Sequence, residues 1–322
     1  MKNGKVSVII ATYNRKKYFE HAVISVLNQT YPYLEVIVVD DGSTDGTKEF
    51  IKSISDNRIK YIYQKNSGQN AAKNTGLLAA LGQYITILDS DDVIHPDKIK
   101  KQVAALVNNP EYGFVYCGTL FINNENNIVG KQKLVKHRGW VLDKLLMKNF
   151  IYNGSNALYK KECIEKVGIF DETVQRMTDW DLYLRMAVHY KFVGLDDYLL
   201  YYRVHDENMS CGFKKYEIAG NTILDRVFAN PDLDKKYLKF KDKAYALRQR
   251  YMARRYFENG DTTTCKSYLK RAFSACPGII LEKESMKLYF LTFLPVDFTQ
   301  NLKRLINSIK KINLTNYKPE DK

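Results

Sequence analysis

The stretch YITILDSDD, residues 84–92, places three carboxylates within four residues at the end of an apolar segment. The apolar part is typical of a buried strand, and carboxylates crowded at its end repel one another and lose hydration if they are partly buried. A divalent cation resolves this conflict, because Mg²⁺ and Mn²⁺ take carboxylate oxygens and keep positions open for phosphate oxygens. The run therefore indicates a cation site; the alternative is a solvated turn that precedes the next helix.

Apolar runs and helical patterns alternate around this stretch. Strands are expected at residues 5–12, 34–43, 59–64 and 83–90. Helices are expected at residues 13–29, 44–54, 70–81 and 96–109, with Thr44 or Asp45 as the N-cap of the second and Pro96 in the first turn of the fourth. This alternation predicts an α/β fold with a doubly wound, mostly parallel sheet that has nucleotide-binding potential.

The rest of the chain is first irregular and then helical. Strands are expected at 113–123 and 191–205 and a helix at 180–189, whereas residues 243–277 have the pattern of an αα-hairpin with its turn at Asn259–Asp261. Residues 301–314 form a basic amphipathic pattern. We therefore expect two domains, a sheet-containing domain over residues 1–212 and a basic helical region over residues 213–322.

Charge is unevenly distributed along the 322 residues, whose formal net charge is +14. Residues 213–322 hold 23 Lys and Arg against 12 Asp and Glu, whereas the preceding residues hold 27 against 24. A basic C-terminal region indicates an anionic partner such as membrane headgroups, nucleic acid or an acidic polymer. The alternative is a contribution to solubility.

Cysteine spacing and apolar run lengths indicate the compartment. The five cysteines are dispersed without metal-like spacing, which favours reduced thiols over disulfides or zinc. The first residues show no signal-peptide pattern, and the longest apolar run, at 288–296, has about half the length of a membrane span. We therefore expect a cytoplasmic protein without a membrane-spanning segment.

Polar side chains follow three of the expected strands. Thr12–Arg15 follow the first, Asp40–Ser43 the second, and Asp89–Asp92 the fourth. Because the carboxyl ends of parallel strands share one rim, these residues can converge on a single ligand. A carboxylate there can accept hydrogen bonds from a base or a ribose; the alternative is that Asp40 or Asp41 caps the next helix.

The segment GQNAAKNTG, residues 68–76, opens a helix with small residues and one cation, Lys73. Amide groups at a helix N-terminus, together with the lysine, suit a phosphate or a sugar hydroxyl. The alternative is that the small residues, Gly76 among them, permit close packing of the helix on the sheet.

Five motifs in order resemble a known family. They read VSVIIATYNR, VIVVDDGSTDGT, NAAKNTG, YITILDSDD and FDETVQRMTDWDLYLRM. From residue 5 to about residue 210 the chain resembles family 2 glycosyltransferases of the GT-A fold. The resemblance implies a nucleotide-diphospho-sugar donor, a Mg²⁺ or Mn²⁺ ion, and sugar transfer with inversion.

The resemblance also implies roles for individual residues. Asp41 falls on the uracil-reading carboxylate, and Asp89 and Asp91 fall on the DxD pair, with Asp91 the expected direct metal ligand. Arg203 and His205 belong to a late motif, YRVH, that approaches the diphosphate or the metal; a structural histidine is the alternative. The implied nucleotide-sugar site comprises Thr12, Tyr13, Asn14, Arg15, Asp41, Lys73, Asp89, Ser90, Asp91 and Arg203, and the implied metal ligands are Asp89, Asp91 and His205.

Asp179 is the catalytic base that the resemblance implies. An inverting displacement needs no covalent nucleophile, but it needs a carboxylate that deprotonates an acceptor hydroxyl. In the motif TDWD, Trp180 is expected to stack on a sugar, and Thr178 stands where the family usually has Glu. The alternative is that Asp179 only stabilises the N-terminus of a helix. Residues 153–156, NGSN, lie where the family shapes its sugar pocket, and Asp92 is expected only to shape the following turn.

The leading hypothesis is a non-processive, inverting glycosyltransferase that transfers a sugar, preferentially from a UDP-sugar, to a saccharide or lipid-linked acceptor in surface or capsular polysaccharide synthesis. A nucleotidyltransferase of the same fold is the first alternative, although the residues after the first strand lack its Gly-rich loop. A non-catalytic scaffold is the second, and the intact carboxylates argue against it.

The basic tail at residues 301–314 is expected to bind anionic membrane reversibly, at the inner face of the plasma membrane. The alternative is that this segment packs on the catalytic domain or forms a dimer contact. No nucleic-acid partner is expected.

Overall fold

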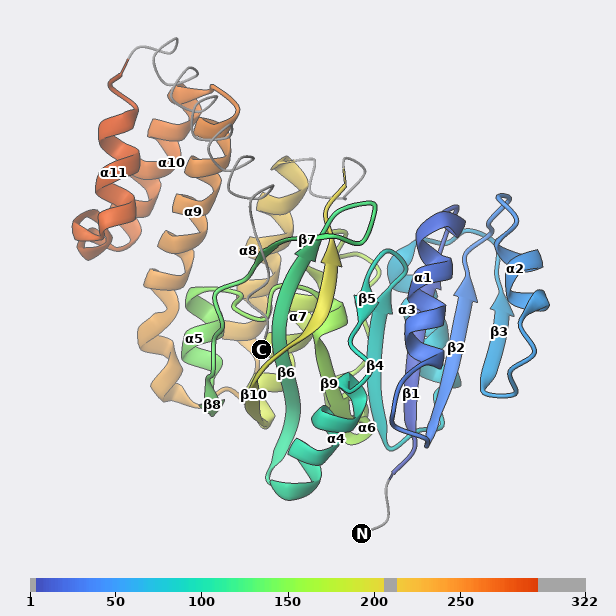
Figure 1. Ribbon diagram of the computed structural model, residues 1–322. Coiled ribbons are helices and arrows are strands. Elements are labelled where there is room, and N and C mark those ends of the chain that lie inside the picture. Colours follow the sequence, from blue (N-terminus) through green and yellow to red (C-terminus); the bar gives the residue numbers. More distant parts are fainter. Residues whose placement is uncertain (1–3, 206–212, 295–322) are drawn as a thin grey trace. The chain divides into compact units, whose positions relative to one another are not determined.

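The computed structural model describes residues 4–205 and 213–294 and divides the chain into two compact units (Figure 1). Within the described residues, the first unit comprises residues 4–141, 149–174 and 178–205, and the second comprises residues 142–148, 175–177 and 213–294. Residues 142–148, which the sequence analysis assigned to the sheet-containing domain, thus group with the helical unit. The tail segment 301–314 lies outside the described residues.

The described strands of the first unit form one ten-stranded sheet. Strands β3, β2, β1 and β4 lie side by side in parallel, β9 joins β4 to β6 by antiparallel pairing on both sides, and β10 pairs with β6 in parallel. The long pairings are parallel, so by paired length the sheet is doubly wound and mostly parallel, as predicted, whereas the short strands β5, β7, β8 and β9 pair in the antiparallel direction. The strands are Val6–Thr12 (β1), Leu34–Asp40 (β2), Ile59–Tyr63 (β3), Tyr84–Asp89 (β4), Val93–Ile94 (β5), Tyr112–Ile122 (β6), Ile128–Lys131 (β7), Arg138–Gly139 (β8), Ala157–Lys160 (β9) and Lys191–Arg203 (β10).

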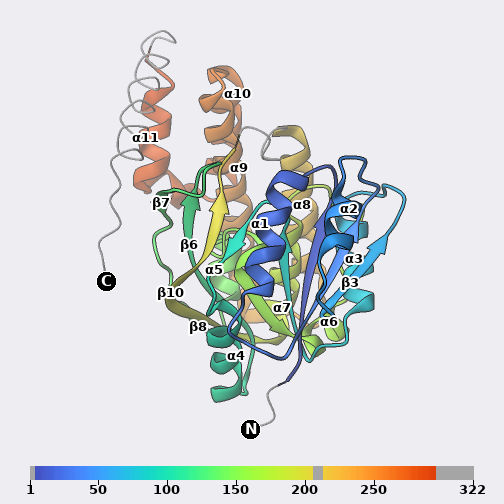
Figure 2. The same ribbon diagram turned by 45° about the vertical axis from the view of Figure 1, so that its right-hand side comes forward.

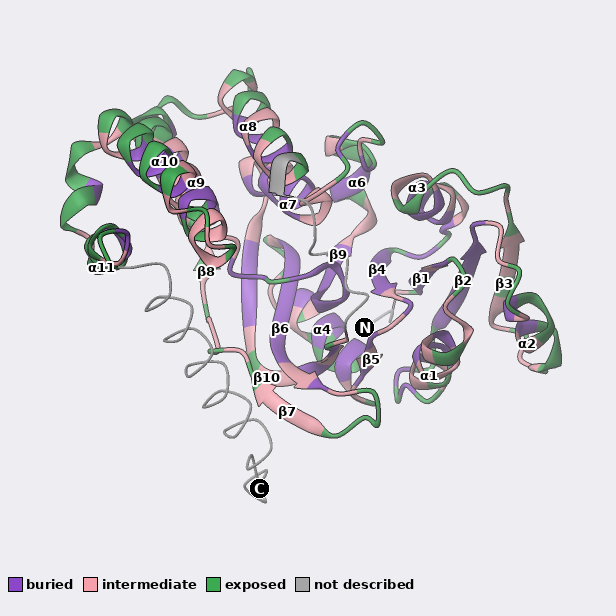
Figure 3. Ribbon diagram, turned by 90° about the horizontal axis from the view of Figure 1, so that it is seen from above, coloured by how far each residue is buried: buried purple, intermediate pink, exposed green. Residues whose placement is uncertain are grey.

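Helices cover both faces of this sheet. Figure 3 shows α1, α2 and α4 on one face and α3, α6 and α7 on the other, with the strands between them largely buried. The helices are Lys16–Leu27 (α1), Thr47–Ser53 (α2), Gln69–Ala79 (α3), Lys98–Asn108 (α4), Lys161–Val167 (α6) and Thr178–His189 (α7), and the 3₁₀ turn η1 is Gly154–Asn156.

Alternation along the strands supplies a core on each face. Val8 and Val36 pack with Phe19 of α1 on the first face. Ile9 belongs to the opposite face, because successive side chains of a strand point to opposite sides. There, a Cβ added to Gly76 of α3 would lie 2.3 Å from Ile9 Cγ2. Gly76 therefore permits close packing of α3 on β1.

Two helix starts differ from the sequence prediction. Helix α2 begins at Thr47, and its N-cap is Gly46, whose φ of 89° lies in the left-handed region that favours glycine. Asp45 instead accepts hydrogen bonds from the backbone amides of Lys16 and Thr47, at 2.8 Å and 3.2 Å, so it ties the starts of α1 and α2 together. Helix α4 begins at Lys98, which leaves Pro96 outside the helix.

The second unit is helical in its described part. Its elements are Leu142–Met147 (α5), Phe213–Ala229 (α8), Lys235–Phe240 (η2), Lys241–Glu258 (α9), Thr262–Ala275 (α10), Pro277–Leu281 (η3) and Lys283–Leu291 (α11). Helices α9 and α10 form an αα-hairpin (Figure 2), in which Gly260 has a φ of 87° and Asp261 caps α10 by accepting from the amide of Thr264 at 2.8 Å. Of the helices in the described ranges, none combines the length and the apolar character that crossing a membrane requires.

Candidate active site

The carboxyl ends of β1, β2 and β4 lie level with one another. In the strand register Thr12 pairs with Asp40, and Ala11 pairs with Asp89. The loops after these strands therefore start from one rim of the sheet, as the alternation of strands and helices in the sequence predicts.

The loop after β1 is locked to the loop after β2. Asn14 has a φ of 48°, its backbone amide donates to Ser43 Oγ at 3.0 Å, and its Oδ1 accepts from the amide of Thr44 at 2.8 Å. Tyr13 beside it is 48% exposed, whereas Thr12 is buried and its Oγ1 has no hydrogen-bond partner among the described residues. A buried hydroxyl without a partner is uncommon and leaves room for a bond to a ligand.

Asp41 organises the loop that leads into α3. Its carboxylate accepts from the backbone amides of Ser67 and Gly68, at 2.8 Å and 2.9 Å, and from Gln64 Nε2 at 2.8 Å. Neither Asp41 nor Asp40 caps α2, because Asp40 accepts from the amide of Ser43 and from Tyr61 Oη. The helix-capping alternative is therefore wrong for both carboxylates.

Lys73 links two of the predicted site carboxylates. Its Nζ lies 3.0 Å from Asp89 Oδ1 and 3.6 Å from Asp179 Oδ1, and the lysine side chain is 2% exposed. Burial acts to lower the pKa of Lys73, but the charges of Asp179 and Asp89 outweigh it and raise this pKa above its ordinary value. Lys73 is thus a charged, buried bridge between Asp89 at the end of β4 and Asp179 in the first turn of α7.

Asp91 has different cationic partners. Its Oδ2 accepts from Arg15 Nη1 at 2.9 Å and lies 3.1 Å from His205 Nε2. Burial acts to raise the pKa of Asp91, but the hydrogen bond with His205 and the charge of Arg15 hold it below the ordinary value. The imidazole is stacked on Tyr18, with 5.0 Å between ring centroids. Asp91 is therefore an ionised carboxylate beside an oriented imidazole.

Arg203 is bound to the neighbouring loops through its guanidinium. It is completely buried, its Nε donates to the carbonyl of Asp91 at 3.0 Å, and its Nη1 donates to the carbonyl of Asn123 at 2.7 Å. Its Nη2 donates to Asn126 Oδ1 at 2.5 Å. The guanidinium thus fixes the backbone that carries Asp91, and its role in donor binding stays a prediction.

Asp92 and Trp180 also differ from the expectations. Asp92 is completely buried, and it accepts from Ser155 Oγ at 2.6 Å and from the amide of Arg203 at 3.1 Å. It therefore does more than shape a turn, because it joins the loop after β4 to η1 and β10. Trp180 is 4% exposed, so its ring belongs to the core and is not available to stack on a sugar. Ser90 is buried as well.

The predicted metal ligands do not all come together. No group of three or more His, Cys, Asp or Glu side chains in the described ranges is placed to hold a metal ion. Asp91 and His205 are adjacent, whereas Asp89 pairs with Lys73. Magnesium sites often combine one or two protein ligands with substrate phosphates and water. The pair Asp91–His205 therefore fits a cation whose coordination a diphosphate completes.

The match to a family model decides which family the chain belongs to. The model described as glycosyl transferase family 2 matches residues 7–168, about half of the chain. The chain belongs to this family. This glycosyltransferase is 31% identical over 220 residues to the uncharacterized glycosyltransferase MJ1057 of Methanocaldococcus jannaschii, a match that covers 66% of this chain and 76% of that protein.

Solved glycosyltransferase structures have the same fold. TarS 1-349 of S. aureus in complex with UDP-GlcNAc is 17% identical, with a TM-score of 0.65 over 94% of this chain and 92% of that one. The mannosyltransferase PcManGT of Pyrobaculum calidifontis in complex with GDP-Man and Mn²⁺ is 20% identical, with a TM-score of 0.62 over 95% and 88%. These likenesses confirm the GT-A fold of the family 2 glycosyltransferase.

Two asparagines of the NAAKNTG motif carry a positioning role that the sequence analysis missed. Asn74 exchanges hydrogen bonds with the backbone of Phe170, at 2.9 Å in each direction, and Asn70 Nδ2 donates to the carbonyls of Asp171 and Val174. These bonds hold residues 170–174 of the glycosyltransferase against α3. The spacing of four residues between the two asparagines, which puts both on one helix face, was the available signal.

Proposed function

We propose that the chain is an inverting glycosyltransferase that moves a sugar from a nucleotide-diphospho-sugar, preferentially a UDP-sugar, to a hydroxyl of a saccharide or lipid-linked acceptor. The setting we propose is surface or capsular polysaccharide synthesis. One observation carries the proposal: Lys73 joins Asp179 to Asp89. The carboxylate of the proposed base therefore lies close to the carboxyl end of β4, where the DSDD run begins.

The proposed donor site lies along the rim formed by β1, β2 and β4. Asp41 is the proposed reader of the base, and the buried hydroxyl of Thr12 is a further point of contact. Tyr13, Asn14, Ser90 and Arg15 complete the proposed site. The complexes of TarS with UDP-GlcNAc and of PcManGT with GDP-Man support a nucleotide-sugar donor.

Asp179 is the proposed base. Its side chain is 24% exposed, and the ammonium of Lys73 lies 3.6 Å from Asp179 Oδ1 on one side of it. In the proposed reaction the acceptor hydroxyl gives its proton to Asp179 as its oxygen attacks the anomeric carbon, and the nucleoside diphosphate leaves from the opposite face. Displacement from the opposite face inverts the anomeric configuration.

Asp91 and His205 are the residues that would hold a Mg²⁺ or Mn²⁺ ion. Such an ion, when bound, neutralises charge that develops on a leaving diphosphate. The Mn²⁺ in the PcManGT complex supports the use of a divalent cation. Asp89 contributes to the site through its pair with Lys73.

A donor panel tests the proposal. The protein is incubated with UDP- and GDP-sugars with and without Mn²⁺, release of nucleoside diphosphate is measured, and the anomeric configuration of any transfer product is determined by proton NMR. We expect metal-dependent release of UDP and an inverted product. The Asp179→Asn variant should lose transfer but keep donor binding, and Asp196→Asn, whose side chain is 61% exposed, serves as the control.

The alternatives give different results. A nucleotidyltransferase would form a nucleotide-sugar from an NTP and release pyrophosphate, and a scaffold would release no nucleotide at all. A product with retained configuration would contradict the role of Asp179 as a general base for direct displacement.

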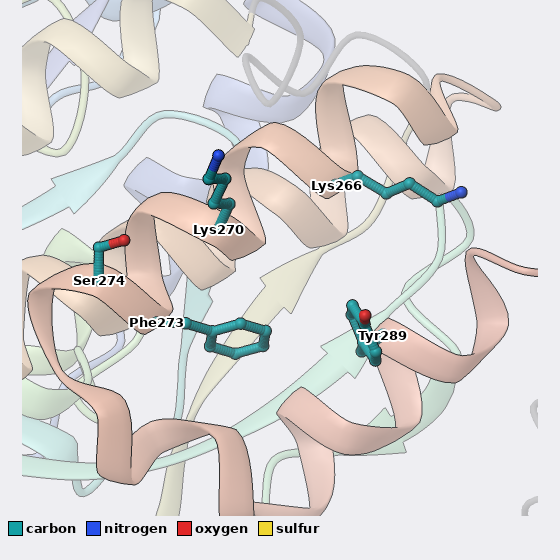
Figure 4. A pocket seen from close by; sticks show the side chains of 5 residues that line it. All are labelled: Lys266, Lys270, Phe273, Ser274 and Tyr289. Carbon is teal, nitrogen blue, oxygen red and sulfur yellow. The ribbon is translucent and has the colours of Figure 1, made fainter.

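We also propose that the second unit contacts anionic membrane. Leu281, Phe290 and Phe293 are 77%, 67% and 61% exposed, and Lys266 Nζ lies 4.7 Å above the ring of Phe293. A pocket of about 420 Å³ is lined by side chains of α10 and α11, and Figure 4 shows these side chains. Exposed rings beside lysines suit the interface of an anionic bilayer. The aromatic–lysine surface comprises Lys266, Lys270, Phe273, Tyr289, Phe290 and Phe293.

Vesicle co-sedimentation with matched variants tests this contact. Replacing Lys266 and Lys270 by Gln should weaken binding to vesicles that contain phosphatidylglycerol about thirtyfold, from roughly 1 kcal/mol per lysine near an anionic surface. The pair Lys48→Gln and Lys52→Gln, also exposed and four residues apart on α2, is the control. The proposal fails if both double variants bind the vesicles equally well. It also fails if the protein binds no vesicles and instead forms a dimer that Phe290→Ser dissociates.

A further inference from the structure

Three polar atoms form a small triangle beside the rim. Arg15 Nη1 lies 2.9 Å from Asp91 Oδ2 and 3.2 Å from His205 Nε2, and these two atoms are 3.1 Å apart. Each pair is within hydrogen-bonding distance. The three residues come from distant parts of the sequence, so the fold itself creates the cluster.

The protonation of the imidazole decides how the triangle is held together. If Nε2 carries a proton, it donates to Asp91 and does not accept from Arg15. If Nε2 carries none, it accepts from Arg15, and its lone pair then faces the carboxylate. The guanidinium keeps its charge in either case. Arg15 therefore supplies a permanent positive charge in front of Asp91 Oδ2 and His205 Nε2.

We propose that Arg15 is the resident cation of the donor-free enzyme. Its guanidinium holds Asp91 Oδ2 and His205 Nε2 until a diphosphate offers it another anionic partner, and these two atoms then become available to a divalent cation. The proposal rests on the metal role proposed for Asp91 and His205. It predicts that donor and cation bind cooperatively, and that Arg15 weakens cation binding when no donor is present.

The surroundings of Arg15 permit this exchange. Its side chain is 22% exposed and that of Asp91 is 19% exposed, so a diphosphate can reach both. Arg203 is different, because it is completely buried and its guanidinium is bound to the backbone on two sides. Tyr18 stacks on the imidazole of His205, and its ring centroid lies 5.1 Å from Arg203 Cζ. The imidazole therefore keeps its orientation when the Arg15 guanidinium moves to another partner.

The test measures cation binding without turnover. Mn²⁺ is titrated into the 322-residue chain without nucleotide, and free Mn²⁺ is followed by electron paramagnetic resonance. The Arg15→Met variant should bind Mn²⁺ at least tenfold more tightly than the wild type, by about 1.4 kcal/mol, because it lacks the charge-assisted hydrogen bond that the cation must replace. Arg15→Lys keeps the charge and should stay close to the wild type.

Arg58→Met is the matched control. Arg58 pairs with Asp56 at 2.7 Å, and the two side chains are 27% and 20% exposed, values close to those of the Arg15–Asp91 pair. This control should leave the Mn²⁺ affinity unchanged. In Arg15→Met the further change Asp91→Asn should abolish the gain, because the gain arises at that carboxylate.

A second titration contains UDP, with a protein-free UDP blank. UDP should tighten Mn²⁺ binding more for the wild type than for Arg15→Met, since the variant has no guanidinium to displace. If wild type and Arg15→Met bind Mn²⁺ equally well without UDP, and both bind it tightly with UDP, the role proposed for Arg15 is wrong. The metal role of Asp91 and His205 would then still stand. If neither protein binds Mn²⁺ even with UDP, the metal role of Asp91 and His205 fails, and the inference fails with it.

Discussion

Two buried lysines are expected to affect the free energy of unfolding with opposite signs. Replacing one of them by methionine should lower it, and replacing the other should raise it. Lys73 and Lys98 lie in the same unit, and they are 2% and 1% exposed. Methionine keeps most of the volume of the aliphatic stem and removes the ammonium group in both cases. The difference between the two variants therefore reports what surrounds each charge.

Lys73→Met should destabilise the protein. The variant leaves Asp89 and Asp179 facing one another without the ammonium that lies 3.0 Å and 3.6 Å from them. Removing one partner of a buried ion pair typically costs about 3–5 kcal/mol. Because the two carboxylates keep 21% and 24% exposure, solvent screening reduces the expected loss to about 2–4 kcal/mol.

Lys98→Met should stabilise the protein at neutral pH. The Nζ of Lys98 lies 3.4 Å from Thr86 Oγ1, and no carboxylate of the described part of the chain pairs with it. Burial lowers the pKa of Lys98 to about 8. At pH 7 the folded protein must keep this ammonium charged inside the core, which disfavours folding. We expect a gain of about 1–3 kcal/mol, since a shift of one pKa unit is about 1.4 kcal/mol.

The pH dependence gives an independent check. Between pH 8 and the ordinary pKa of 10.5, the unfolded chain binds a proton at Lys98 that the folded protein does not. The contribution of Lys98 to stability therefore rises with pH across this window and is absent in Lys98→Met. Other titrating groups are common to both proteins and cancel in the difference.

Urea unfolding of the wild type and both variants at pH 7 and pH 9.5, without donor or metal, measures these effects. The gap between Lys98→Met and the wild type should shrink as the pH rises. If Lys73→Met is as stable as the wild type, the ion-pair bridge contributes nothing, and the argument that it holds Asp179 fails. If Lys98→Met is destabilised equally at both pH values, the cost of the buried charge has been overestimated.

Three further changes are expected to act through single contacts. Asp179→Asn should lower kcat by a factor of about 10²–10⁴ and leave the donor Kd, measured by calorimetry, unchanged. An equal loss of kcat and of donor affinity would mean that Asp179 binds the donor instead. Ser155→Ala removes the 2.6 Å hydrogen bond to Asp92 and should cost about 1–3 kcal/mol in urea unfolding; no loss would mean that Asp92 is satisfied without it. Gly76→Ala places a Cβ 2.3 Å from a side chain and should cost about 1–3 kcal/mol, unlike Gly278→Ala, which has open space.

The sequence was sufficient to predict the rim of the sheet, because regular alternation fixes parallel strands and parallel strands share their carboxyl ends. The strands β1, β2, β3 and β4 lie where their apolar runs are. Strand β9 was not predicted, since its four residues, Ala157–Lys160, show neither a long apolar run nor alternation. Its place between β4 and β6 depends on pairing with segments that are distant in sequence.

Side-chain partners were the part that the sequence did not reveal. The motif YRVH puts Arg203 near a diphosphate by resemblance, yet the guanidinium binds carbonyls of Asp91 and Asn123. This outcome depends on how β10 and the loop after β6 meet, which no local pattern encodes. Lys73 and Lys98 illustrate the same limit, because both occupy helices and only the fold decides that one of them meets carboxylates.

The three carboxylates of the DSDD run are distinguished by partners from other segments. Burial raises the pKa of Asp89 and raises that of Asp92 well above the ordinary value, whereas the hydrogen bond with His205 and the charge of Arg15 outweigh burial and lower the pKa of Asp91. A cation binds most readily where a carboxylate is ionised and its other partners can leave. Asp92 is enclosed, and Asp89 is held by a buried lysine. Asp91 is the carboxylate of the run that meets both conditions, so a metal requirement should depend on it far more than on its two neighbours.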